Sequence, residues 1–157
     1  MVQVVRELDN YEVWLLISGE ELYPFSSHGF EFAQGSLRSV VARSSDNLFL
    51  NAEGEVFKIA GIYPHHNNLA AKTMRLLNIP YGIEVKLERQ NIEISELKEM
   101  LVVGLENYRS QADDDEVWTF ATLPPSTSKT SIMNANDTVQ LFAILDLPTP
   151  LDCLDSL

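Results

Sequence analysis

The chain has 157 residues, 45% hydrophobic and 22% charged, a composition typical of one globular domain with a substantial core. Its 23 Asp and Glu outweigh its 11 Lys and Arg, so the formal net charge is −12 at pH 7. The electrostatic field of this net negative charge repels nucleic acid and anionic membranes and attracts cationic surfaces. We therefore expect neither nucleic acid nor a membrane as a partner.

Cysteine usage and the absence of apolar segments indicate the compartment. Cys153 is the only cysteine, so no internal disulfide can form, and a reducing compartment is favoured. The first residues lack the basic region and apolar run of a signal peptide. No stretch approaches the roughly 20 apolar residues that cross a bilayer. The sequence therefore predicts a cytoplasmic protein.

The first residues of the chain have the composition of strands. Residues 2–8 and 11–17 are rich in apolar and β-branched side chains, and Asp9 and Asn10 lie between them. Two apolar runs separated by a short polar turn are typical of an antiparallel hairpin. We therefore predict that these two segments pair with each other.

A second hairpin is predicted further along the chain. Residues 48–50 and 55–59 flank a short polar turn in which Gly54 can adopt a positive φ. The intervening residues 18–47 are broken by glycine and proline. Within them, residues 36–43 fit either a helix or a strand.

Two helices are predicted in the middle of the chain. Asn67 or Asn68 can cap the first, which runs to Asn78 with Pro80 beyond its end. Ser95 can cap the second. The expected apolar faces are Leu69, Thr73, Leu76 and Leu77 in the first helix, and Leu97, Met100, Leu101, Leu105 and Tyr108 in the second.

The remaining segments are predicted mainly as strands. Residues 82–87 alternate apolar and charged side chains, and residues 117–123 and 138–145 are apolar, aromatic and β-branched. Residues 124–131 are polar and begin with two prolines, which is typical of an exposed loop. Residues 147–157 alternate acid and leucine, and they fit either a disordered end or a segment that orders on a partner.

These elements together predict an α+β fold. Residues 1–146 form one domain with a mainly antiparallel sheet and two central helices packed on one face, and residues 147–157 form an acidic, leucine-containing C-terminal tail.

Metal-binding and catalytic patterns are absent from the sequence. His65 and His66 are adjacent, so their side chains diverge, and neither His28 nor Cys153 lies at a ligand spacing from them. No glycine-rich phosphate loop and no nucleophile elbow occurs. We therefore predict no metal, no cofactor and no catalytic residue. An enzyme whose site is assembled from distant residues around the histidines stays open as an alternative.

Glu84 and Lys86 are similar to the carboxylate and lysine at the end of a metal-dependent nuclease strand. Such a site needs a second acidic ligand nearby, and no aspartate occurs between Asp46 and Asp113. An acidic surface also binds phosphates poorly. The solvated face of a strand explains these two residues better.

The sharpest local feature is a run of four carboxylates beside an aromatic residue. It consists of Asp113, Asp114, Asp115 and Glu116, followed closely by Trp118. Protein interfaces use aromatic anchors ringed by charge, because charge speeds encounter and aromatic burial slows release. We predict that these residues bind a partner, with Tyr23 and Phe25 as further candidates. A solvated loop is the alternative.

The acidity and the lack of a catalytic motif favour a non-catalytic protein that neutralises a basic protein partner. An immunity or antitoxin partner of a cationic toxin, such as a nuclease, is the model for this function. The alternative is an adaptor or structural subunit that docks through residues 147–157 or through a sheet edge. The sequence leaves the identity of the partner and the oligomeric state open.

Overall fold

The computed structural model describes residues 2–5, 12–30, 32–33, 46–64, 69–77, 79, 81–113 and 118–148. Its strands are β1 (Val2–Val5), β2 (Val13–Ser18), β3 (Glu21–Ser26), β4 (Phe32–Ala33), β5 (Leu48–Leu50), β6 (Val56–Pro64) and β7 (Tyr81–Gln90). Its helices are the short 3-10 helix η1 (Ser27–Phe30), α2 (Leu69–Leu76), α3 (Ile94–Gln111), α4 (Thr119–Thr122), α5 (Pro125–Asn134) and α6 (Thr138–Leu145).

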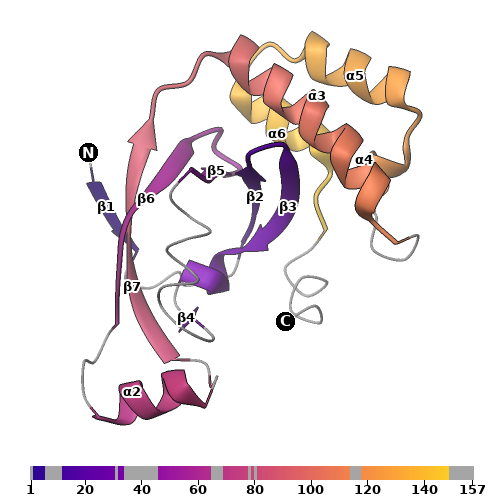
Figure 1. Cartoon of the computed structure of the whole chain (residues 1–157). Helices are drawn as coiled ribbons and strands as arrows, with labels where there is room; N and C mark the ends of the chain where they lie inside the picture. The colour runs from indigo at the N-terminus through magenta and orange to yellow at the C-terminus, as the bar shows by residue number, and fades with distance from the viewer. Residues whose placement is uncertain are drawn as a thin grey trace.

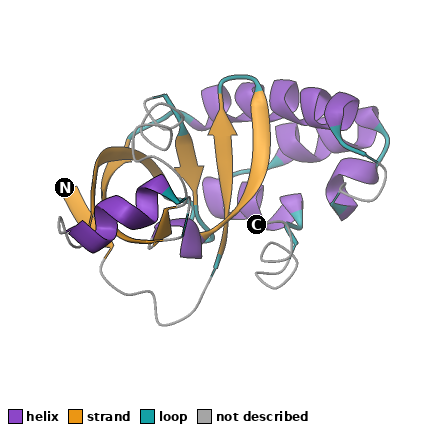
Figure 2. Ribbon diagram, turned by 60° about the horizontal axis from the view of Figure 1, so that its bottom comes forward, coloured by secondary structure: helices purple, strands orange, loops and turns teal. Residues whose placement is uncertain are grey.

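The strands form one seven-stranded sheet in the order β1-β7-β6-β5-β2-β3, and β4 pairs with β7 beside this path. Each described pairing is antiparallel. Figures 1 and 2 show α3, α4, α5 and α6 gathered on one side of the strands, and α3 contacts β2 and β3. The molecule is therefore an α+β domain, as the sequence predicted.

The central strands are buried on both faces. In β5, Leu48 and Leu50 point to the helix layer while Phe49 points to the opposite side, and all three are buried. Successive side chains of a strand point to opposite faces, so one short strand contributes to two cores. We call them the helix-side core and the aromatic core.

The aromatic core is held together by rings from β2, β5 and η1. Phe30 is fully buried, and its ring centroid lies 5.1 Å from that of Trp14 and 5.0 Å from that of Phe49. Ser27, at the start of η1, anchors this short helix, because its amide donates to the Glu12 carbonyl and its hydroxyl accepts from the Glu12 amide, both at 2.8 Å. The chain after β3 is thus fastened so that Phe30 closes the core.

Gly104 allows α3 to lie unusually close to β3. A Cβ atom at this position would stand 2.5 Å from Cγ of the buried Leu22. Because any larger residue would push helix and strand apart, Gly104 sets the spacing of the two layers. Leu97, Leu101 and Leu105 of the same helix are buried in the helix-side core.

The central predicted elements are confirmed. Residues 48–50 and 56–64 form the predicted second hairpin, with Gly54 at φ 75°. The two helices are present as α2 and α3, and the predicted strand 82–87 lies within β7. Asn67, Asn68 and Asn78 are outside the described residues. Ser95 is not the cap of α3, because the helix begins at Ile94 and Glu93 occupies the capping position.

The predicted pairing of the first two strands is wrong. β1 pairs with β7, and β2 pairs with β3 and β5. The hairpin partner of β2 follows it, because Gly19 adopts φ 60° in the short turn that leads into β3. A glycine in such a turn favours a hairpin more strongly than the Asp9-Asn10 pair does.

The predictions for the last third of the chain are also wrong. Residues predicted as strands and as a loop form α4, α5 and α6. Pro125 occupies the first turn of α5, where its missing N–H costs nothing. The Asp137 side chain caps α6 by accepting from the Gln140 amide at 2.7 Å. The proline at the start of α5 and the aspartate cap of α6 favour helices more strongly than the β-branched composition of these segments favours strands.

Among the described residues, none of the helices combines the length and the apolarity that crossing a membrane requires.

The start of the predicted tail belongs to the domain. Leu147 is half-buried against the helix-side core. Residues 149–157 lie outside the described part of the chain.

Candidate partner-binding surface

The outward face of α3 carries a stripe of acidic side chains. Glu96, Glu99, Val103 and Glu106 recur at the three- and four-residue spacing that places them on one side of a helix. All four are exposed, whereas Leu97, Leu101 and Leu105 face the core. We call these four residues the acidic stripe; Val103, 43% exposed, is its one apolar member.

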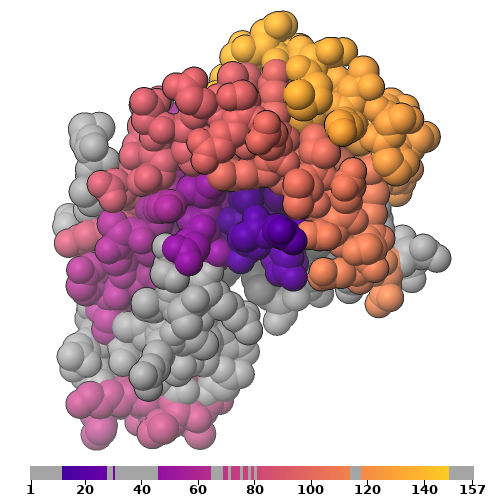
Figure 3. Space-filling view, turned by 45° about the horizontal axis from the view of Figure 1, so that its top comes forward, coloured from indigo at the N-terminus to yellow at the C-terminus, as the bar shows by residue number. Residues whose placement is uncertain are grey.

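The β2–β3 turn extends the acidic stripe. The Asn107 side-chain amide donates to the Glu20 carbonyl at 2.8 Å, so the turn is tied to α3. Glu21, the first residue of β3, accepts a hydrogen bond of 2.5 Å from the Tyr23 hydroxyl of the same strand. In Figure 3 the indigo surface of this hairpin lies directly beside the salmon surface of α3. Two more carboxylates therefore stand next to the stripe.

Both basic residues of α3 are directed toward the other helices. The Lys98 ammonium donates to the Met133 carbonyl in α5 at 2.9 Å. The Arg109 guanidinium donates to the carbonyls of Ala121 and Leu123 at 2.6 and 2.7 Å. Both bases therefore donate to carbonyls of other elements, although Arg109 also stays close enough to Glu106 to interact with its charge.

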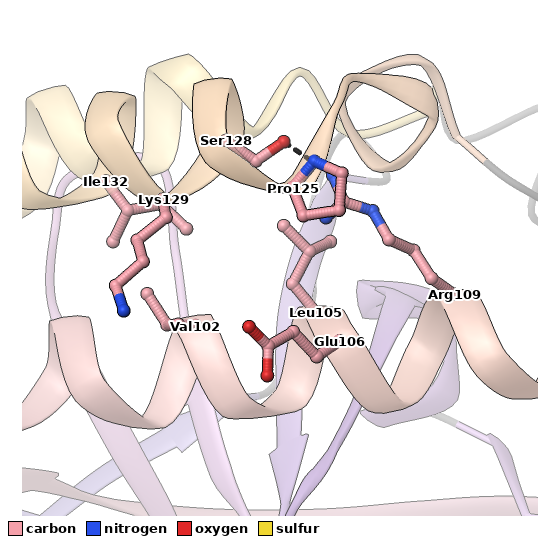
Figure 4. Close-up of a pocket in the computed structure, with 8 residues that line it drawn as sticks. All are labelled: Val102, Leu105, Glu106, Arg109, Pro125, Ser128, Lys129 and Ile132. Atoms are coloured by element: carbon pink, nitrogen blue, oxygen red, sulfur yellow. Dashed lines mark hydrogen bonds between the residues drawn. The ribbon is translucent and has the colours of Figure 1, made fainter.

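Arg109 also borders a small hollow between α3 and α5. Figure 4 shows its lining residues: Val102, Leu105, Glu106, Arg109, Pro125, Ser128, Lys129 and Ile132. The guanidinium donates to the Ser128 hydroxyl at 2.5 Å. Burial lowers the pKa of Arg109 from its usual value, and the nearby Glu106 carboxylate opposes that shift. Arg109 therefore fastens α4 and α5 to α3.

The predicted acidic run is only partly described. Asp113 is exposed, two residues beyond the end of α3, so it continues the acidic surface along the chain. Asp114, Asp115 and Glu116 lie outside the described residues, and their predicted contact with a partner stays a prediction.

Trp118 requires a correction. Its side chain is only 5% exposed and belongs to the helix-side core, with its ring centroid 4.3 Å from that of Tyr108. An aromatic residue beside acids can point either outward or inward, and here it fills the space between α3 and α4. Trp118 therefore presents no anchor to a partner in this conformation.

The two weaker candidates differ from each other. Tyr23 is exposed, with its hydroxyl held by Glu21, so it can contact a partner beside the acidic stripe. Phe25 is half-buried, and its ring centroid lies 4.8 Å from that of Phe30 and 5.1 Å from that of Phe49. Phe25 thus contributes mainly to the aromatic core.

Most of the acidic stripe was not predicted, although the apolar face of the predicted helix implies that positions 96, 99, 103 and 106 face solvent. These acids are separated in sequence and become neighbours only on the helix, so they do not stand out as the contiguous acids of residues 113–116 do.

The remaining candidate sites concern possible metal ligands. Among the described residues, no group of three or more His, Cys, Asp and Glu side chains lies close enough to hold a metal ion. His65, His66 and Cys153 are outside this part of the chain, as is the side chain of His28, so the alternative site around the histidines stays a prediction. Lys86, which was compared above with the lysine of a nuclease strand, lies over an aromatic ring. Its ammonium stands 4.9 Å from the centroid of the Tyr63 ring.

No protein-family model matches this chain, and neither a curated protein nor a solved structure does.

Proposed function

We propose that this domain is a non-catalytic protein that binds and neutralises a basic protein partner, in the manner of an immunity or antitoxin protein acting on a cationic toxin such as a nuclease. The observation that carries the proposal is the acidic stripe of α3, whose glutamates surround an exposed valine while both bases of the helix donate to carbonyls of other elements. The adjoining Glu20 and Tyr23 widen this surface.

The mechanism is occlusion of a cationic site. Long-range attraction between the carboxylates and a lysine- and arginine-rich surface speeds the encounter. Val103 and Tyr23 provide the apolar contact that slows release. Lysines and arginines that a nuclease uses for phosphates are then paired with glutamates and unavailable to its substrate. The only cysteine favours a reducing compartment, so we place this encounter in the cytoplasm.

The test is affinity capture with two charge-matched variants. The chain is immobilised, incubated with native cell extract at low and high salt, and the bound protein is identified and its affinity measured. Glu96→Gln/Glu99→Gln/Glu106→Gln removes three charges from the stripe, and Asp46→Asn/Glu53→Gln/Glu88→Gln removes three exposed charges elsewhere. We expect a basic partner, weakened at least about tenfold by the stripe variant and by salt, because close charge pairs carry this much coupling.

Two results would contradict the proposal. Equal weakening by both variants would mean that only the net charge matters. An affinity that is unchanged in high salt would mean that electrostatic attraction does not contribute to the complex.

An adaptor or structural subunit is the second candidate. A different observation favours it: large apolar side chains of α2 are exposed. Leu76→Ser/Leu77→Ser separates the two functions, because loss of partner capture by the folded variant favours the adaptor.

A further inference from the structure

The acidic stripe runs in a straight line along α3. Its members, Glu96, Glu99, Val103 and Glu106, are separated by three, four and three residues. This alternation is the spacing of the a and d positions of a coiled coil, which keeps side chains in one line along a helix. At 1.5 Å per residue, the stripe covers about 15 Å of this 18-residue helix. Such a line fits a second helix that crosses α3 at about 20°, because contact is then kept over several turns.

The small hollow between α3 and α5 borders the stripe on one side. Glu106 belongs to both, and Val102 and Pro125 give the hollow apolar walls beside it (Figure 4). A helix that lies on the stripe can therefore place apolar side chains against these walls and against Val103. Lys129, exposed on α5, repels bases, so the basic side of such a helix must face α3. The surface thus combines an acidic line with an apolar flank.

The β2–β3 hairpin, on the other side of the stripe, is a poor site for an added strand. Within the described sheet, β3 is an edge strand. The Ser27 amide donates to the Glu12 carbonyl, so the alternation of an antiparallel pair directs the backbone polar groups of residues 22, 24 and 26 toward the outer side of β3. The central one of these residues is Pro24, which has no N–H to donate. Strand pairing at this edge is therefore interrupted in the middle.

We propose that the basic partner presents an α-helix to the acidic stripe, with lysines or arginines along one side at alternating spacings of three and four residues. This inference rests on the proposed function and names the element of the partner that is recognised. The bases of this helix pair with the three glutamates, and an apolar residue between them contacts Val103. Its neighbouring apolar side chains contact the hollow, in the manner of a helix bound in a groove.

The period of the stripe favours a helix over an extended segment. Members of the stripe recur about every 5 Å along α3, as do side chains on one side of any other helix. Side chains on one face of a strand recur about every 6.6 Å, so they fall out of step with the glutamates within three contacts. An extended basic segment is consequently expected to pair with fewer of them.

Three charge-matched peptides test the proposal. The first is a fluorescein-labelled, alanine-based peptide of about 20 residues, long enough to form a helix, with lysines along one side at alternating spacings of three and four. The second has the same composition with its lysines distributed around the helix. The third keeps the one-sided order but has two central alanines replaced by proline, which breaks the helix.

Fluorescence anisotropy at low salt measures their binding to the full chain. We expect the one-sided peptide to bind at least about tenfold more tightly than either of the others, because three exposed charge pairs formed together contribute about this factor. Glu96→Gln/Glu99→Gln/Glu106→Gln should abolish this preference. Asp46→Asn/Glu53→Gln/Glu88→Gln, which removes three exposed charges elsewhere, should preserve it. Circular dichroism should show that both variants remain folded.

Several results would overturn the helical partner. These are equal binding of the three peptides, binding of none of them, or a preference that survives in the stripe variant. Equal binding that weakens with salt would still agree with neutralisation of a basic partner through another kind of element. Failure to capture a basic protein from the native extract would instead remove the proposed function itself, so the two failures are distinguishable.

Discussion

Arg109 shows how a single side chain organises several elements. Its guanidinium donates to the carbonyls of Ala121 and Leu123 and to the hydroxyl of Ser128. The first two are backbone acceptors around the end of α4, and Ser128 is buried in α5. An arginine fork can satisfy three acceptors from one side chain, which a lysine on the same helix could not do with this geometry.

We expect Arg109→Met to lower the free energy of unfolding by about 2 kcal/mol, because charge-assisted hydrogen bonds are lost and their acceptors stay partly buried. Chemical denaturation measures this change, and hydrogen exchange should locate the loss of protection in α4 and α5. Lys129→Met, which changes an exposed residue lining the same hollow, is the control and should have little effect. Equal destabilisation by both variants would contradict the fastening role.

At the scale of elements, the β5–β6 hairpin packs against the start of α6. Gly54 adopts φ 75° in the hairpin turn, and a Cβ atom there would lie 2.5 Å from Oγ1 of Thr138 and 2.7 Å from the amide nitrogen of Val139. The second atom belongs to the backbone and cannot rotate away. This glycine therefore serves both the turn and the contact between sheet and helix layer.

Gly19 offers a control with a similar backbone and no contact. It has φ 60°, and nothing lies within 4 Å of a Cβ atom built there. We expect Gly19→Ala to cost about 1 kcal/mol through backbone strain alone. Gly54→Ala should cost about 2–3 kcal/mol, since the clash adds to that strain. Equal losses in urea denaturation would mean that the hairpin does not depend on its contact with α6.

At the scale of the whole molecule, carboxylates dominate the charge. The acidic stripe on the helix layer concentrates some of them, and others, such as Asp46, Glu53 and Glu88, are exposed elsewhere. The net charge of −12 therefore makes the folded chain repel itself, since most of its charges are carboxylates.

Raising the ionic strength from low to near-physiological salt should therefore stabilise the fold. We expect a gain of about 1 kcal/mol, which corresponds to a rise in Tm of roughly 2–4 °C for a chain of this size. Differential scanning calorimetry measures it. The variant Glu96→Gln/Glu99→Gln/Glu106→Gln should show a smaller rise, because it has less repulsion to screen. A Tm that falls with salt would contradict this account.

Local signals in the sequence determined a large part of this molecule. The leucine spacing of α3 and the glycine of the β5–β6 turn predict their elements directly, because helical periodicity and positive φ are properties of a few neighbouring residues. The same signals predict the α+β class and, read more fully, the acidic stripe opposite the buried leucines. The capping Asp137 likewise marks the start of α6, although the apolar composition after it suggested a strand.

Only the tertiary structure decided which strands pair and which aromatic residues are buried. β1 lies beside β7, more than 75 residues away in sequence, and no short turn between neighbouring residues marks this pairing. Trp118 points inward, where its ring packs against that of Tyr108 on α3. Packing brings together residues from distant parts of the chain. The residues next to a side chain in sequence therefore do not determine whether it is buried.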